Sequence, residues 1–382
     1  MNEIQSTHST IDKLIEVLGH LKNVFVGKDE IIDLMGLCLV GRENLFILGP
    51  PGTAKSATVR ELSKLIDGHT FEYLLTRFTE PNELFGPFDI RKLREGDLVT
   101  NTEGMLPEAS FIFLDELLNA NSAILNSLLM VLNERVFRRG RETKKLPALM
   151  VIGASNHLPE DEALGALFDR FLIRVKSENV DPQLLEEVLN AGWALEKNTA
   201  ARPLGVSADE IRALQGLTSA IDLSGIRSAY IELVYQMRNA GLLISDRRAV
   251  KLQRMIAASA LICKRSQAIL SDLWILKHIW DTEEQREIIA NIVNAHIAAD
   301  TTEHQHPRAT SNSVPNAEEI YQETQRLMEQ WSLPGTTLSE KSLIKDRLLH
   351  LNNRAEWIGN ETQRKYVQEP IDELWKQIMQ EA

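Results

Sequence analysis

The stretch "LFILGPPGTAKSATVRELSKLI" (residues 45–66) contains the pattern that decides the fold. Four apolar residues are followed by a glycine-rich loop, and the loop leads into residues with helical periodicity. A strand, a Gly-rich loop ending in Lys-Ser and a helix make a phosphate-binding loop, because backbone amides and the helix N-terminus then face an anion. A structural turn with a chance Lys-Ser is disfavoured, because all three parts agree.

One residue departs from the usual loop. Most loops of this kind have glycine directly before the lysine, whereas this chain has Ala54. If Ala54 begins the helix, it needs only a right-handed or extended backbone. We therefore expect the substitution of alanine for glycine to cost little free energy.

The loop is expected to hold the phosphates of ATP. Lys55 would supply a full positive charge for the β- and γ-phosphates, and the Ser56 hydroxyl would bind Mg²⁺. The expected nucleotide-binding residues are Gly49, Pro50, Pro51, Gly52, Thr53, Ala54, Lys55, Ser56 and Ala57.

A second site is predicted at "FIFLDEL" (residues 111–117), where an apolar run ends in two acids. Carboxylates at the end of a buried strand are costly unless a cation or a water molecule uses them. We expect Asp115 to order Mg²⁺ and Glu116 to polarise the attacking water. The alternative is a strand that merely ends in acids at the surface, and the phosphate loop upstream disfavours it.

Further polar residues follow later apolar runs. In "LMVIGASN" (149–156), Asn156 at a strand tip could orient the water, although an Asx turn would give the same pattern. In "LFDRF" (167–171), Arg170 could reach a γ-phosphate across a subunit boundary, or form a surface ion pair with Asp169. "ISDRRAVKLQRMI" (244–256) places Arg247 and Arg248 in the first turn of a helix, where cations oppose the helix dipole unless an anion is near.

The order of segments predicts an α/β domain followed by helical ones. Apolar runs at 45–48, 71–75, 111–115, 148–154 and 171–175 alternate with helical patterns, which indicates a parallel sheet covered on both faces. From about residue 176 only helical patterns remain, with starts marked by Ser207, Ser245 and Ser271. We expect an α/β nucleotide-binding domain over 1–180, an all-α lid over 181–299, a polar linker over 300–316 and a C-terminal helical extension over 317–382.

Composition narrows the function classes. The formal net charge of −12 argues against a global nucleic-acid-binding surface. No uninterrupted apolar run reaches 18 residues, so no transmembrane helix is expected. Cys38 and Cys263 lie among apolar neighbours and are expected to be buried thiols in a cytoplasmic protein. His304 and His306 lie in the expected linker without a second ligand pair, so zinc is not expected there.

Taken together, the motifs resemble those of the AAA+ ATPases and, within them, the MoxR family. "FEYLLTRFTEPNELFGPFDI" (71–90) and "GMLPEASFIFLDELLNANSAILNSLLMVLNERVF" (104–137) are most similar to its RavA branch. The resemblance extends over about residues 10–295. It makes Asn156 the sensor 1 residue and Arg170 an arginine finger acting in trans. Arg247 becomes the preferred sensor 2 residue, with Arg248 as its rival.

The resemblance also implies how the protein works. ATP and Mg²⁺ would be its cofactors, a homo-hexameric ring its assembly, and a protein with a von Willebrand factor type A domain its probable partner in remodelling a client. Residues 86–106 and 136–147 would form hairpins that face the pore, and the second hairpin is rich in basic residues. A solvated turn is the alternative for that hairpin.

Two other function classes fit parts of the sequence. A nucleic-acid motor related to replicative helicases would share both hairpins but would need a basic inner surface. A scaffolding ring that binds ATP without hydrolysing it is disfavoured by the intact pair Asp115 and Glu116.

Overall fold

The protein is described here by a computed structural model. It describes residues 2–95, 98–139, 142–159, 161–180, 184–197, 205–298, 300, 306–310, 317–332, 341, 344–345, 347–348, 351–352, 355 and 361–380. The chain forms two compact units, Met1–Ala309 and Thr310–Ala382.

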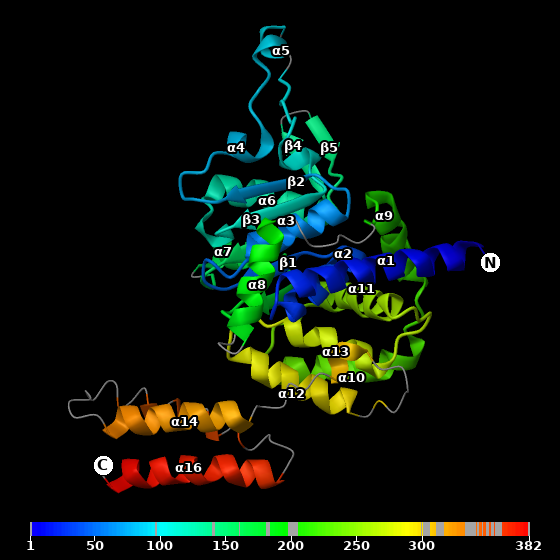
Figure 1. Ribbon diagram of the computed structural model, residues 1–382. Coiled ribbons are helices and arrows are strands. Elements are labelled where there is room, and N and C mark those ends of the chain that lie inside the picture. Colours follow the sequence, from blue (N-terminus) through cyan, green and yellow to red (C-terminus); the bar gives the residue numbers. More distant parts are fainter. Residues whose placement is uncertain are drawn as a thin grey trace. The chain divides into compact units, whose positions relative to one another are not determined.

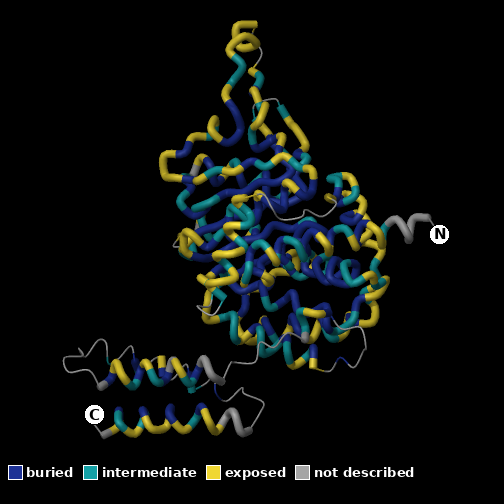
Figure 2. The backbone as a smooth tube through the Cα atoms, in the orientation of Figure 1, coloured by how far each residue is buried: buried dark blue, intermediate teal, exposed yellow. Residues whose placement is uncertain are grey.

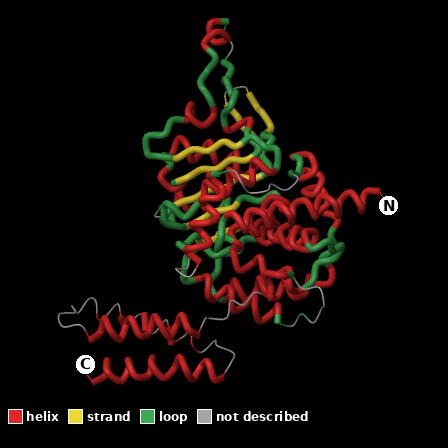
Figure 3. The backbone as a smooth tube through the Cα atoms, viewed as in Figure 1, coloured by secondary structure: helices red, strands yellow, loops and turns green. Residues whose placement is uncertain are grey.

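A five-stranded parallel sheet forms the centre of the first unit (Figures 1 and 3). Its order is β2-β3-β6-β1-β7. The strands are β1 (Leu45–Leu48), β2 (Thr70–Leu74), β3 (Phe111–Asp115), β6 (Met150–Ser155) and β7 (Ile173–Lys176). Side chains on both faces of β1, β3 and β6 are buried apart from Asp115, as a parallel sheet between two helical layers requires (Figure 2). The predicted α/β fold class and its five strands are confirmed.

Helices connect and cover these strands. In the α/β part they are α1 (Asn2–Val24), α2 (Asp29–Gly41), α3 (Lys55–Leu65), α4 (Pro81–Phe85), α5 (Ile90–Arg94), α6 (Ser122–Glu134) and α7 (Glu162–Phe168). The long α1 packs on α2 and α3. Its residues Ile11, Leu14 and Leu21 are buried because apolar residues recur at helical spacing along one face.

The second half of the first unit is helical. It comprises α8 (Leu185–Glu196), α9 (Ala208–Leu217), α10 (Arg227–Asn239), α11 (Asp246–Ile262), the 3₁₀ segment η6 (Leu270–His278), α12 (Gln285–Ile297) and the short α13 (Pro307–Thr310). Ser207 begins α9 with a capping box to Glu210, and Ser245 caps α11. Ser271, by contrast, is buried inside η6 and does not begin it, so that expected helix start is wrong. None of the helices among the described residues is both long and apolar enough to cross a bilayer.

Two insertions project from the sheet domain. The first forms an arm with α5 at its tip, closed by an antiparallel bridge between Phe88 and Thr100 (Figure 1). The second is a two-stranded hairpin of β4 (Val136–Arg139) and β5 (Glu142–Lys145). Hairpins are therefore present where the sequence predicted them, although Arg141 lies outside the described residues.

The expected linker begins inside the first unit. The His306 ring is buried and stacks on Trp274 with ring centroids 4.9 Å apart, and its backbone N–H donates to Ser271 Oγ at 3.0 Å. Burial lowers the pKa of His306 to about 4, so the ring is neutral. The polar composition predicts a linker that includes His306, but aromatic stacking on Trp274 holds this residue in the lid. His304 lies outside the described residues.

The second unit has its own apolar core. Its helices α14 (Ala317–Ser332) and α16 (Glu361–Gln380) contact each other, and Pro370 lies inside α16. Between these two helices, much of the predicted helical extension lies outside the described residues. Core residues include Ile320, Leu327, Leu374 and Ile378.

Candidate functional site

The sheet order brings three predicted motifs to one edge. Strand β6 lies between β1 and β3, and all three run parallel. Since the carboxyl ends of parallel strands meet at one edge, the loops after Leu48, Leu114 and Ser155 are neighbours. A hydrogen bond from Gly49 N–H to the Ser155 carbonyl, 2.9 Å long, joins two of these loops directly. We call this region, formed by residues 49–57, Asp115, Glu116 and Asn156, the nucleotide edge.

The phosphate loop has the shape of an anion cradle. A Cβ atom at Gly49 would lie 2.1 Å from the Ser177 carbonyl oxygen, so only glycine fits there. Gly52 has a φ of +83°, which favours glycine as well. Lys55 Nζ donates to the carbonyl oxygens of Gly49 at 2.7 Å and Pro50 at 2.9 Å. These contacts hold the ammonium group inside the loop.

Ala54 does not adopt the expected conformation. Its φ of 62° and ψ of 17° lie in the left-handed region, and it is the residue that precedes α3. The loop must reverse direction there before the helix begins, and a Cβ atom in that conformation costs roughly 1–2 kcal/mol. The prediction that alanine replaces glycine here at little cost is therefore wrong.

The electrostatics of Lys55 suit a phosphate. Burial of the Lys55 ammonium lowers its pKa from the ordinary value, and the negative charges of Asp115 and Glu116 act in the opposite direction. A buried ammonium beside two carboxylates is the arrangement that a phosphate with a bound cation can bridge. The residues therefore fit ATP with Mg²⁺.

The two acids at the end of β3 differ in their backbone geometry. Asp115 Oδ1 accepts the Glu116 backbone N–H at 3.0 Å. Glu116 itself has a φ of 50°, a left-handed conformation that costs of order 1 kcal/mol and occurs often at functional sites. Both side chains remain partly exposed.

The donor set suits Mg²⁺ better than a metal held by protein alone. The described part of the chain contains no group of three or more His, Cys, Asp and Glu residues that could hold a metal ion. Mg²⁺ is commonly held by one or two protein oxygens together with phosphate oxygens and water. Ser56 and Asp115 are the residues that could provide those protein oxygens.

Asn156 lies at the end of β6, between the phosphate loop and the acid pair. Its side chain is exposed, whereas the preceding Ser155 is fully buried. The amide is thus available at the nucleotide edge, where the sequence pattern placed a water-orienting residue.

The predicted arginines are found elsewhere. Arg170 and Arg247 line one small hollow together with Asn133, Asp169, Leu172, Ser245, Arg248 and Lys251, and no phosphate-loop residue lines it. We call this region the arginine hollow. Arg170 pairs with Asp169 at 2.8 Å and is 25% exposed, so the surface ion pair considered as its alternative role does form. Arg247 is exposed and donates to Asn133 Oδ1 at 3.0 Å.

Arg248 has a different environment from Arg247. Its guanidinium is buried, donates to the Ile279 carbonyl, and contacts both Asp281 oxygens at 3.2 Å. Asp281 is shared with Arg174 of β7, which is fully buried. Burial and the charge of Arg248 lower the pKa of Arg174, Asp281 raises it, and the resulting pKa is about 9. Arg248 is therefore linked to the sheet through Asp281, while the exposed Arg247 lies where a ligand can reach it.

Sequence reasoning missed Lys28. Its Nζ contacts Ser177 Oγ at 3.5 Å and the Glu178 carbonyl, next to the phosphate loop. Burial lowers its pKa, Glu178 raises it, and the charge of Lys55 lowers it, so the two ammonium groups are close enough to interact. A cation directly before a helix opposes the helix dipole, as in "SDRR", but this local pattern does not show which site the cation faces.

Comparison with known proteins agrees with this geometry. Residues 12–216 match the family model described as the MoxR domain in MoxR-vWA-beta-propeller ternary systems, and residues 221–293 match an AAA lid domain. Two uncharacterised proteins of Methanocaldococcus jannaschii are similar. The first is 34% identical, and the match covers 74% of this chain and 73% of the relative. The second is 35% identical, and the match covers 71% of this chain and 72% of the relative.

A named relative and a solved structure are more distant. The chaperone MoxR1 of Mycobacterium tuberculosis is 25% identical over 47% of this chain and 48% of its own. The crystal structure of a candidate ATPase from Cytophaga hutchinsonii has a TM-score of 0.64 at 21% identity and covers 76% of this chain and 96% of its own, which shows a shared fold.

Proposed function

Because the chain belongs to the MoxR family of AAA+ ATPases, we propose that it hydrolyses ATP in a ring and uses the energy to remodel a client protein. The observation that carries this proposal is the convergence of Lys55, the acid pair and Asn156 at one edge of the sheet. Magnesium bound with the nucleotide would neutralise charge that develops on the phosphates.

Each residue of the nucleotide edge has a distinct role in this proposal. Lys55 exchanges its carbonyl partners Gly49 and Pro50 for phosphate oxygens. Ser56 and Asp115 hold the cation. Glu116 accepts a proton from the attacking water, and Asn156 orients that water.

Arg170 and Arg247 are proposed to act on the nucleotide of a neighbouring subunit. They line the arginine hollow together, and the phosphate loop of the same chain contributes nothing to it. A ring in which the arginine hollow of one subunit meets the nucleotide edge of the next would complete the site. This explains why a chain would carry exposed cations that its own nucleotide does not use.

The partners remain part of the proposal. The matched family model describes systems that include a von Willebrand factor type A protein, which makes such a protein the proposed partner of this chain. A homo-hexamer, a cytoplasmic location and a closer relation to the RavA branch stay predictions. The exposed hairpin residues Arg138 and Lys144 would contact the client, and the net charge of −12 favours a protein client over nucleic acid.

Two substitutions test the proposal. Lys55→Ala should abolish ATP binding, because it removes the buried charge that meets the phosphates. Glu116→Gln should leave binding intact and lower turnover by about 10²–10⁴-fold, the usual contribution of a general base. Binding is measured with a fluorescent ATP analogue and turnover by phosphate release. Normal turnover by Glu116→Gln would contradict the assigned chemistry.

A matched control keeps the result specific. Glu72→Gln makes the same chemical change on strand β2, where Glu72 pairs with the exposed Arg60. It should leave both binding and turnover near the unmodified level.

A further inference from the structure

A second hollow lies at the opposite edge of the sheet from the nucleotide edge. Its volume is about 480 Å³, and residues 146–149 form one wall of it. These residues precede β6, whereas Asn156 follows it. A strand of six residues rises about 20 Å, so the hollow is separate from the phosphate loop.

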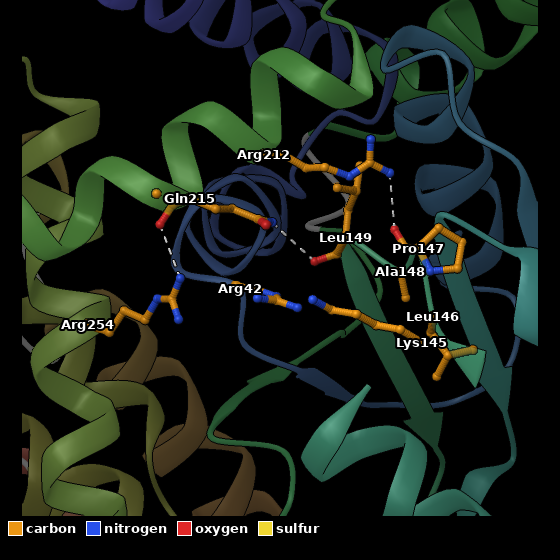
Figure 4. Close-up of a pocket in the computed structure, with 10 residues that line it drawn as sticks. Arg42, Lys145, Leu146, Pro147, Ala148, Leu149, Arg212, Gln215 and Arg254 are labelled. Carbon is orange, nitrogen blue, oxygen red and sulfur yellow. Dashed lines mark hydrogen bonds between the residues drawn. The ribbon is translucent and has the colours of Figure 1, made fainter. Parts of the chain in front are cut away.

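Four cationic side chains line this hollow, and no carboxylate does. Arg42 comes from the end of α2, Lys145 from β5, Arg212 from α9 and Arg254 from α11. Figure 4 shows Lys145 and Arg42 extending into the same space, with Arg212 and Arg254 at its sides. Since four separate elements bring like charges together, their mutual repulsion has to be offset by something else.

The neighbouring acids offset the cluster only in part. Arg212 pairs with Asp209, whose side chain is 92% exposed, so solvent screens that pair. Glu43 binds Lys251 at 2.9 Å, and its charge acts to raise the pKa of Arg254, but burial and the charge of Arg42 prevail and lower that pKa. Arg254 donates to the Gln215 carbonyl at 3.1 Å, and its Nε is buried without a hydrogen-bond partner.

The backbone at Arg42 adds an independent observation. Arg42 ends α2 with a φ of 55°, a position where glycine is usual and an arginine side chain adds strain. Strained residues of this kind concentrate at ligand sites. Arg135 lies behind the wall, with its carbonyl oxygen accepting the Leu146 N–H at 2.8 Å, and it too has a positive φ of 54°. Burial lowers the pKa of Arg135 to about 10, with the charge of Glu43 acting in the opposite direction and that of Arg42 in the same direction.

We propose that this hollow, which we call the basic pocket, binds a compact ligand that carries two or more phosphate groups. Three guanidinium groups and one ammonium group match several negative charges in a small volume, whereas one acidic side chain of a peptide would supply only one. Guanidinium groups recognise phosphate oxygens in pairs. A volume of about 480 Å³ is in the range of small-molecule sites, and the apolar wall offers a surface for the rest of the ligand.

The experiment uses inorganic pyrophosphate as the probe. Titration calorimetry is performed on the full chain carrying Lys55→Ala, so that the phosphate loop does not contribute. We expect binding at one site per chain. Adding Arg254→Met, or separately Arg42→Gly, should weaken that binding about tenfold or more, the value of one hydrogen bond between charged groups.

The choice of variants separates binding from folding. Glycine tolerates the backbone of Arg42, so Arg42→Gly should keep or raise the melting temperature while it weakens pyrophosphate binding. Arg60→Gln is the matched control, because Arg60 is exposed on α3 and pairs with Glu72 outside the basic pocket. It should bind pyrophosphate as the Lys55→Ala parent does.

Three results would overturn the proposal. They are the absence of pyrophosphate binding in the Lys55→Ala chain, binding by the Arg42→Gly and Arg254→Met variants that is as tight as in the Lys55→Ala parent, and binding of a hexaglutamate peptide without any binding of pyrophosphate. Because the probe is read without ATP turnover, none of these results bears on the proposed hydrolysis.

Discussion

The nucleotide edge and the arginine hollow differ in how the chain balances their charges. At the nucleotide edge, the cation Lys55 lies near Asp115 and Glu116 of the same chain. The arginine hollow is lined by four cations and one acid, Asp169. The first region has one cation beside two acids, whereas in the second the lining cations outnumber the one lining acid and Arg247 donates to the neutral Asn133. The contrast supports a division of the catalytic site between two subunits.

The substitution Arg170→Ala is the most direct test of this comparison. If Arg170 serves the neighbour's nucleotide, turnover should fall by about 10³–10⁵-fold, the range known for arginine fingers. ATP affinity should change little, because Lys55 and the loop remain. Phosphate release and nucleotide binding measure the two effects. Full turnover by an Arg170→Ala ring of normal size would refute the division.

Mixing two inactive variants sharpens the same comparison. Glu116→Gln affects the nucleotide edge and Arg170→Ala the arginine hollow, so a mixed ring contains some sites in which both groups are intact. We expect mixing to restore a measurable part of the turnover. The control is a ring built only from chains that carry both substitutions. Its turnover should stay as low as that of either single variant. Equal inactivity of the mixture and the double variant would argue for sites within one subunit.

Within the arginine hollow, Arg247 and Arg248 should separate activity from stability. Arg248→Ala removes buried hydrogen bonds to Ile279 and Asp281 and should lower the free energy of unfolding by about 1–3 kcal/mol. Arg247→Ala removes an exposed side chain and should change the free energy of unfolding by no more than about 0.5 kcal/mol. It should nevertheless lower turnover. Denaturant unfolding and phosphate release are measured on both variants. Loss of stability in Arg247→Ala but not in Arg248→Ala would reverse the assignment.

At the nucleotide edge the smallest effect is expected from Ala54→Gly. Glycine relieves the left-handed strain at this position but loses more backbone entropy on folding, so the net gain should be about 1 kcal/mol or less. Thermal unfolding without nucleotide measures it. Gly165→Ala is the control and makes the reverse substitution. It lies inside α7, where a Cβ atom would meet nothing within 4 Å, so alanine should stabilise the helix slightly. Destabilisation by Ala54→Gly would show that the strain is compensated locally.

Much of the fold follows from short apolar runs with clear ends. Each of the five runs predicted to be a strand is a strand, because parallel strands buried on both faces require continuous apolar residues. No single apolar run determines the order of the strands in the sheet. It is the packing of β6 between β1 and β3 that places Asn156 beside the phosphate loop.

The site could be predicted only in part, for reasons visible at particular residues. The conformation of Ala54 depends on how the whole loop closes, which its own residue type does not reveal. Arg247 and Arg248 are adjacent in the chain, and only the packing of residues 279–281 separates their roles. Lys28 reaches Ser177 across 149 positions of sequence, a contact that a local pattern cannot indicate.

Asp281 is one of several points that join the lid to the sheet domain. Its carboxylate links Arg248 of the lid to Arg174 in β7, and Arg174 also donates to the Trp280 carbonyl at 2.6 Å. Elsewhere α11 packs along α2, and Lys251 of α11 pairs with Glu43. Removal of the Asp281 carboxylate would therefore loosen the lid beside β7 and leave its seam with α2 closed.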